Sequence, residues 1–147
     1  MVHKKVIKIA LIDSNRDVLF LIRSVTHPRY PNELDLPGGI IEYGENALSG
    51  ILRELKEECG ITIEPQSIFK LSELQYSAAW QYYLAVAKCK EVFPKLSSEH
   101  CAYKKCNMDS LASFGPLNSA RDPYMIFAKK SLIDNADRIT TWLSHSE

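Results

Sequence analysis

Two apolar segments near the start of the chain predict paired β-strands. Residues 5–12 are almost all apolar and include many β-branched side chains, which is typical of a strand buried on both faces. Residues 13–17 are polar and typical of a turn, and residues 18–25 have the composition of a strand that returns in a hairpin. Residues 26–33 contain two prolines and predict a loop.

A helical period replaces the strand pattern in the middle of the chain. The apolar residues that recur every three or four positions are Leu48, Ile51, Leu52 and Leu55. This spacing forms one apolar stripe, which faces the core in an amphipathic helix. Asn46 is suited to cap the start of the helix, and Gly60 is suited to the position just after its end. We therefore expect a helix over residues 47–59.

The second half of the chain predicts more strands and a second long helix. The expected strands are residues 61–63, 68–76, 80–90 and 103–107. Residues 109–113 predict a short helical turn, and Asp122 before Pro123 is a good start for a final helix of about 20 residues. Strands flanked by two substantial helices predict an α/β fold, an α/β/α sandwich with a mixed β-sheet. No linker or repeat divides the chain, so residues 1–147 are expected to form a single domain.

The composition narrows the classes of partner. Lys and Arg total 18, as do Asp and Glu, so the chain has no overall basic field to attract a nucleic-acid duplex. Its apolar runs are too short to span a membrane, and its first residues lack the apolar core of a secretory signal. The four scattered cysteines are expected to be reduced. These features predict a cytoplasmic protein that binds a small molecule.

Three acidic residues lie where a helix least favours them. Glu54, Glu57 and Glu58 fall in the last turns of the predicted helix, whose C-terminus carries about half a negative charge. Neighbouring glutamates at these spacings also repel each other by roughly 0.2–0.5 kcal/mol per pair. On their own the three could form a solvated charged face. A divalent cation is the simplest partner that would favour converging carboxylates at this position.

The glutamates are part of a longer motif. Residues 39–61 spell G-x5-E-x7-R-E-U-x-E-E-x-G-U, where U is a bulky aliphatic residue. This pattern resembles the complete signature of the Nudix hydrolases. The resemblance extends upstream through Leu36-Pro37-Gly38-Gly39 and downstream to Ser98-Glu99-His100. It implies cleavage of the pyrophosphate bond of a nucleoside diphosphate linked to another group, with Mg²⁺ or Mn²⁺ as cofactor.

Each carboxylate of the motif has a chemical reason to be there. Mg²⁺ prefers oxygen ligands, and Glu54 and Glu58, one helical turn apart, can point at one ion. Glu57 lies beside them, where it could serve a second ion or a water molecule. Arg53, four residues before Glu57, is positioned to fix that carboxylate by a charge-assisted hydrogen bond.

Gly38, Gly39 and Glu45 have supporting roles in this interpretation. Gly38 and Gly39 let the backbone approach the metal and the phosphates because they lack a Cβ. The resemblance implies that the carbonyl of Gly38 is a metal ligand. Glu45, near the start of the helix, is expected to tie the preceding loop to the helix.

Four residues outside the motif helix are further candidates. The resemblance to MutT-type enzymes suggests Glu99 as a metal ligand or general base, Arg23 as a phosphate-binding residue and Asn118 as a base-binding residue. Asp35 could line the same pocket. The alternatives are an ordinary loop glutamate for Glu99, an exposed strand-end charge for Arg23 and a turn asparagine for Asn118. Tyr76 and Trp80 could stack on a base or simply pack in the core.

These residues leave three functions open. The first is a MutT-type enzyme that converts a (d)NTP to a nucleoside monophosphate and pyrophosphate. The second is a hydrolase of dinucleoside polyphosphates, ADP-ribose or nucleotide sugars; Tyr76 stands where ADP-ribose enzymes often have proline, which argues slightly against ADP-ribose. The third is a nucleotide sensor without catalysis, although sensors usually lose a motif glutamate and this chain keeps all of them. The resemblance also makes a homodimer plausible.

Overall fold

The computed structural model describes residues 4–90 and 93–145. Residues 1–3, 91–92 and 146–147, which the single-domain prediction includes, lie outside the described residues. The strands are β1 (Lys4–Ile12), β2 (Asp17–Arg23), β3 (Leu34–Asp35), β4 (Gly38–Ile40), β5 (Ile68–Gln75), β6 (Trp80–Lys88) and β7 (His100–Asn107). The α-helices are α1 (Ala47–Cys59), α2 (Gly115–Asn118), α3 (Pro123–Asp134) and α4 (Ala136–His145), and two 3₁₀ helices are η1 (Pro65–Ser67) and η2 (Met108–Ser113).

The described strands form one mixed sheet in the order β3-β2-β1-β6-β5. β1 and β6 run parallel along their whole length, from Lys4 opposite Trp80 to Ile12 opposite Lys88. The other pairs are antiparallel, and β4 and β7 extend the sheet from β1 and β2. β1 therefore occupies the centre, as its apolar run predicts.

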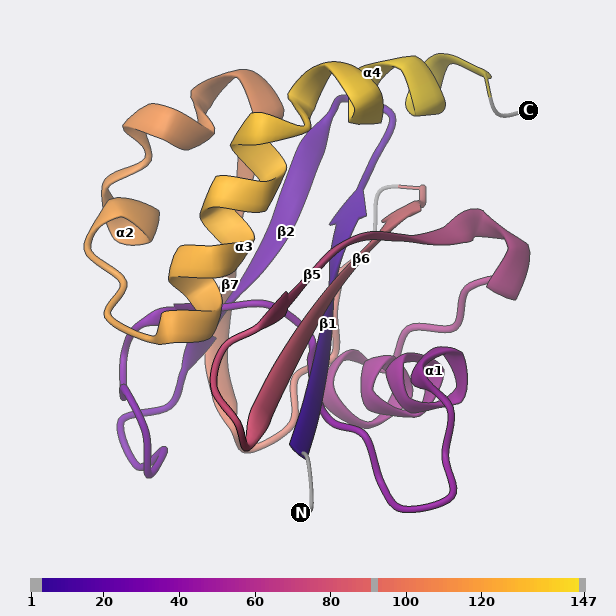
Figure 1. The fold of residues 1–147 in the computed structure, drawn as a ribbon. Helices are drawn as coiled ribbons and strands as arrows, with labels where there is room; N and C mark the ends of the chain where they lie inside the picture. Colours follow the sequence, from indigo (N-terminus) through magenta and orange to yellow (C-terminus); the bar gives the residue numbers. More distant parts are fainter. Residues whose placement is uncertain (1–3, 91–92, 146–147) are drawn as a thin grey trace.

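Helices cover both faces of the sheet (Figure 1). Alternate residues of β1 point to opposite faces, so Ile7 and Ile9 pack in the cluster that contains Leu55 of α1. Ala10 and Ile12 pack in the second cluster, which contains Met125 of α3. The predicted α/β/α sandwich with a mixed sheet is confirmed. None of the described helices is long and apolar enough to cross a membrane.

The caps of α1 form as the sequence predicts. The Asn46 side chain accepts a hydrogen bond from the Ser49 N–H at 2.8 Å. Gly60 ends the helix with φ 64°, a left-handed conformation that glycine adopts without strain. Its N–H donates to the Lys56 carbonyl, and the Ile61 N–H donates to the Leu55 carbonyl.

Three predictions of secondary structure from the sequence are wrong. Residues 61–63 do not form a strand; the Ile61 N–H is bonded to the end of α1, and its side chain packs with that helix in the core. The final helix is interrupted at Asn135, whose backbone leaves the helical conformation with φ −109° and ψ 19°, so α3 and α4 are separate helices. The last strand is longer than predicted because it begins at His100 and pairs with β2 along its length.

Candidate active site

A cavity of about 740 Å³ opens beside β1 between the two helical layers. Its volume lies within the usual range for a small-molecule site. The lining comes from several elements far apart in the sequence, including α1, β1, β6, the loop after β2 and the start of α3. The lining residues are Val6, Lys8, Arg23, His27, Arg29, Tyr30, Asp35, Gly38, Gly39, Ile40, Glu42, Glu54, Glu58, Tyr76, Trp80, Tyr82, Glu99, Asp122, Pro123 and Tyr124.

Close contact between α1 and β4 determines where the helix presents its carboxylates. Glu58 is buried, and its Oε1 accepts a hydrogen bond from the Gly38 N–H at 2.7 Å. A Cβ on Gly38 would lie 2.2 Å from the Ile7 carbonyl oxygen, and one on Gly39 would lie 2.9 Å from Glu54 Oε2. Gly38 is therefore needed for β4 to lie this close to β1, and Gly39 leaves room for the Glu54 carboxylate beside β4.

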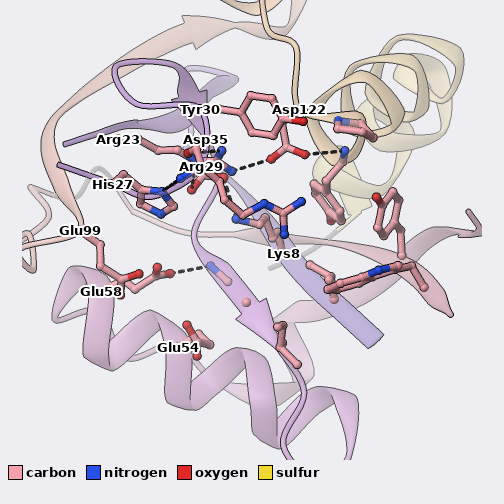
Figure 2. Close-up of a pocket in the computed structure, with 18 of the residues that line it drawn as sticks. Lys8, Arg23, His27, Arg29, Tyr30, Asp35, Glu54, Glu58, Glu99 and Asp122 are labelled. Atoms are coloured by element: carbon pink, nitrogen blue, oxygen red, sulfur yellow. Dashed lines mark hydrogen bonds and ion pairs between the residues drawn. The ribbon is translucent and has the colours of Figure 1, made fainter. Parts of the chain in front are cut away.

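Negative charge is crowded at this side of the cavity. Burial raises the pKa of Glu58 to about 8, although Lys8 and the Gly38 N–H oppose the shift. Burial also raises the pKa of Glu54 despite its ion pair with Arg53, and the nearby charges of Glu57 and Glu99 add to the effect. Figure 2 shows Glu99 reaching from its loop towards Glu58, with Glu54 one turn further along α1. Additional positive charge here would stabilise the ionised carboxylates.

Arg53 ties the loop before α1 to two carboxylates of the helix, Glu54 and Glu57. Its Nε lies 2.8 Å from Glu45 Oε2, and its Nη1 lies 2.7 Å from Glu54 Oε1 and 3.1 Å from Glu57 Oε1. Glu45 Oε1 in turn accepts a hydrogen bond from the Glu42 N–H. The expected contact of Arg53 with Glu57 is therefore present, as is the link that Glu45 makes between loop and helix. The planar guanidinium can make these contacts together because its donors form a fixed fork.

A buried charge network forms part of the cavity wall. Asp35 Oδ1 lies 2.7 Å from Lys8 Nζ, and its Oδ2 lies 3.2 Å from Arg23 Nε and 3.0 Å from His100 Nε2. Arg23 Nη2 donates to Asp122 Oδ2 at 2.6 Å. Burial alone would raise the pKa of Asp35, but Lys8, His100 and Arg23 outweigh it and hold that pKa well below its usual range. The network fixes the backbone and side chains on which the cavity is built.

Aromatic side chains line the cavity near the ends of β5 and β6. The rings of Tyr76 and Tyr82 stack with their centroids 5.0 Å apart, and Tyr82 meets Tyr124 edge to face at 5.2 Å. Tyr76 is half exposed. Trp80 also lines the cavity. Flat, partly exposed rings are suitable surfaces for a nucleobase.

The motif geometry agrees with the comparison to protein families. The model of the NUDIX domain matches residues 2–126 of this chain. The chain belongs to the Nudix family. The predicted family resemblance is therefore confirmed. Within the family, the chain is 34% identical over 70 residues to the 8-oxo-dGTP diphosphatase of Escherichia coli (strain K12). It is 38% identical over 81 residues to the asymmetrical bis(5'-nucleosyl)-tetraphosphatase of Sus scrofa.

These two alignments cover 48% and 50% of this chain, and each spans 54% of the relative. The chain thus spans about half the length of the curated relatives it matches.

Solved structures resemble this chain over much more of their length. A MutT protein from Methanosarcina mazei Go1 has a TM-score of 0.71 at 22% identity, covering 95% of this chain and 96% of the other. A C. elegans Ap4A hydrolase has a TM-score of 0.65 at 19% identity, covering 92% and 98%. Both likenesses establish the Nudix fold.

Nudix proteins typically use a divalent metal ion. The carboxylates of Glu54, Glu58 and Glu99 face one cavity and supply the oxygen donors that Mg²⁺ prefers. Among the described residues, no three His, Cys, Asp or Glu side chains are already arranged around a common point. Glu54 is paired with Arg53 and Glu58 with the Gly38 N–H, so these carboxylates would turn to share an ion. The donor chemistry and the crowded charge both fit such an ion.

The cavity brings together seven of the ten predicted site residues: Arg23, Asp35, Gly38, Gly39, Glu54, Glu58 and Glu99. Arg53 lies behind Glu54. Glu57 is exposed and bonded to Arg53, outside the cavity lining. Asn118 also lies outside this lining, in α2, where its Nδ2 donates to the Ala112 carbonyl at 3.2 Å. The proposed roles of Glu57 in metal binding and of Asn118 in base binding remain predictions.

Sequence reasoning missed most of the basic residues of the site. Lys8, His27 and Arg29 all line the cavity, as does Asp122 at the start of α3. Lys8 could have been recognised from the sequence, because a lysine inside an otherwise apolar central strand must find a buried partner. No pattern in the sequence indicated His27 and Arg29, because they lie in a loop whose path depends on contacts elsewhere in the fold.

Proposed function

We propose that this chain is a metal-dependent pyrophosphohydrolase that cleaves a nucleoside diphosphate linked to another group. The observation that carries the proposal is the convergence of Glu54, buried Glu58 and Glu99 on one cavity that also has cationic and aromatic walls. The complete set of motif glutamates argues against a sensor without catalysis. The favoured reaction is hydrolysis of a (d)NTP to a nucleoside monophosphate and pyrophosphate.

Glu54, Glu58 and Glu99 would hold Mg²⁺ or Mn²⁺, with the Gly38 carbonyl as a further ligand. A bound ion would neutralise phosphate oxygens and make an attacking water more acidic. Glu99 would accept a proton from that water, since it is an exposed carboxylate at the edge of the cavity. Arg53 would hold Glu54 and Glu57 in orientation through the contacts described above. Tyr76 and Trp80 would receive the base.

Two substrate classes have specific support. The similarity to an 8-oxo-dGTP diphosphatase supports a nucleoside triphosphate. The similarity to an asymmetrical bis(5'-nucleosyl)-tetraphosphatase supports a dinucleoside polyphosphate as the second candidate. We further propose a cytoplasmic protein of one domain that forms a homodimer, in line with its composition and family.

A hydrolysis panel tests the function. The purified chain would be incubated with Mg²⁺ and (d)NTPs, diadenosine polyphosphates, ADP-ribose and nucleotide sugars, and products would be separated by chromatography. We expect a nucleoside monophosphate from at least one substrate, and loss of turnover with EDTA. Nucleotide binding without turnover of any of them would favour the sensor. Full turnover in Glu54→Gln or Glu58→Gln would contradict the metal assignment.

A further inference from the structure

Four basic residues line the cavity, and two of them are already neutralised within the protein. Lys8 Nζ lies 2.7 Å from Asp35 Oδ1. Arg23 is buried and pairs through Nε with Asp35 and through Nη2 with Asp122. Sequence resemblance made Arg23 the candidate for phosphate binding, but its guanidinium is largely occupied by these contacts. The remaining candidates are His27 and Arg29, in the loop after β2.

The backbone of Arg29 is held in place. Arg23 Nη1 donates to its carbonyl oxygen at 3.1 Å, and its own N–H donates to His27 Nδ1 at 3.1 Å. The next residue, Tyr30, has the guanidinium groups of Arg23 and Arg121 over its ring at 5.7 and 5.6 Å. Arg23 is itself locked by two carboxylates, so the loop is anchored to the buried charge network.

The guanidinium of Arg29, in contrast, is not neutralised. Within residues 4–90 and 93–145 it makes no hydrogen bond or ion pair, and the residue is exposed at the cavity. Burial raises the pKa of Tyr82 on the aromatic wall, and the positive charge of Arg29 opposes that rise. Figure 2 shows His27 and Arg29 across the cavity from Glu54 and Glu58. A fixed backbone with a free, forked cation is suited to binding a phosphate of the ligand.

We propose that Arg29 binds a phosphate of the substrate beyond the two at the carboxylate cluster, and thereby selects nucleoside triphosphates and polyphosphates over nucleoside-diphosphate sugars. This inference rests on the proposed function and adds a selectivity to it. His27 supports the contact, because its Nδ1 accepts the Arg29 N–H and its Nε2 is left to donate towards the same anion. In a nucleoside-diphosphate sugar a neutral sugar follows the second phosphate and has no charge to match Arg29, whereas a third phosphate does.

The test compares two substrates with the same base, GTP and GDP-mannose, in the wild type, Arg29→Gln and Arg29→Lys. We expect Arg29→Gln to lower kcat/KM for GTP by roughly 10- to 100-fold, which is the effect of losing one charge-assisted hydrogen bond. The same variant should change kcat/KM for GDP-mannose by less than about twofold. Arg29→Lys should recover part of the loss, because it keeps the charge and loses the fork. The unfolding midpoint should not change, since the guanidinium has no partner in the described protein.

Lys104→Gln is the matched control, because it removes the same charge from an exposed position outside the cavity lining. An equal loss for both substrates in Arg29→Gln, or no loss for either, would overturn the inference. If the wild type hydrolyses no substrate of the panel described above, the proposed function fails; if it hydrolyses others but neither GTP nor GDP-mannose, that function stands. The selectivity is then measured by binding in the presence of Ca²⁺, where an unchanged affinity ratio of GTP to GDP-mannose in Arg29→Gln would overturn it.

Discussion

Glu58 Oε1 and the backbone N–H of Gly38 are joined by a hydrogen bond of 2.7 Å between α1 and β4. This bond holds a buried carboxylate at the cavity wall in a setting where burial raises its pKa to about 8. A residue chosen for stability alone would be apolar at this position. The bond therefore links the packing of the helix to the chemistry proposed for the site.

Gly38→Ala is expected to destabilise the protein by roughly 2–4 kcal/mol. The new Cβ would lie 2.2 Å from the Ile7 carbonyl oxygen, and the residue has φ 139°, which L side chains rarely adopt. Urea unfolding measures the loss. Gly115→Ala is the control, because nothing lies within 4 Å of its added Cβ and its φ is not positive. Equal stability of the two variants would show that β4 does not need its close approach to β1.

The stability of the metal-free protein should fall as pH rises from about 5 to 8. The unfolded chain releases the Glu58 proton near its ordinary pKa of 4.5, while the folded state keeps it up to about 8. The contribution is therefore complete below pH 4.5 and lost by pH 8, with a slope of at most about 1.4 kcal/mol per pH unit.

The measurement is urea unfolding in EDTA at several pH values for the wild type and Glu58→Gln. We expect a weaker decline in the variant, which has no proton to release. Exposed Glu64→Gln is the control and should keep the wild-type slope. Parallel curves for the wild type and Glu58→Gln would contradict the assigned protonation of Glu58.

Asp35→Asn is expected to cost roughly 3–5 kcal/mol, because it leaves Lys8 and part of Arg23 as buried charges without their partner. The exposed pair of Lys130 and Asp134, at 2.7 Å on α3, provides the comparison. Asp134→Asn should cost less than about 1 kcal/mol. Denaturant unfolding of both variants checks the contrast, and similar losses would show that the Asp35 network is not a buried one in solution.

Glu99→Gln should reduce kcat by about 10²-fold or more with the fold intact, as expected on losing a general base. Glu99 is exposed, so its neutralisation leaves no buried charge without a partner. Steady-state kinetics on the best substrate of the panel, together with circular dichroism, measures the effect. Near-wild-type turnover would remove Glu99 from the mechanism.

The sequence predicted the parts of the structure whose causes are local. The cap at Asn46, the glycine at residue 60 and the apolar stripe between them define α1 almost to the residue. The motif likewise indicated Glu54 and Glu58, because their spacing follows from one helical turn. The break at Asn135 is also local, but a single residue that leaves the helical backbone conformation does not interrupt the apolar pattern.

The rest of the site depends on contacts between distant residues. Lys8 and Asp35 are 27 residues apart, and Arg23 and Asp122 are 99 apart. Resemblance alone indicated Arg23 for phosphate binding, yet its burial between Asp35 and Asp122 became visible only in the folded chain. The position of Arg29 follows from that same network, so no pattern along the chain could have predicted it.

The most direct test of the central claim is a crystal structure with Mn²⁺ and a non-hydrolysable nucleoside triphosphate, using anomalous scattering to locate the metal. The account predicts an anomalous peak within coordinating distance of carboxylate oxygens of both Glu54 and Glu58, bridged to a phosphate of the nucleotide. A nucleotide in the cavity with no metal at these two carboxylates would contradict it.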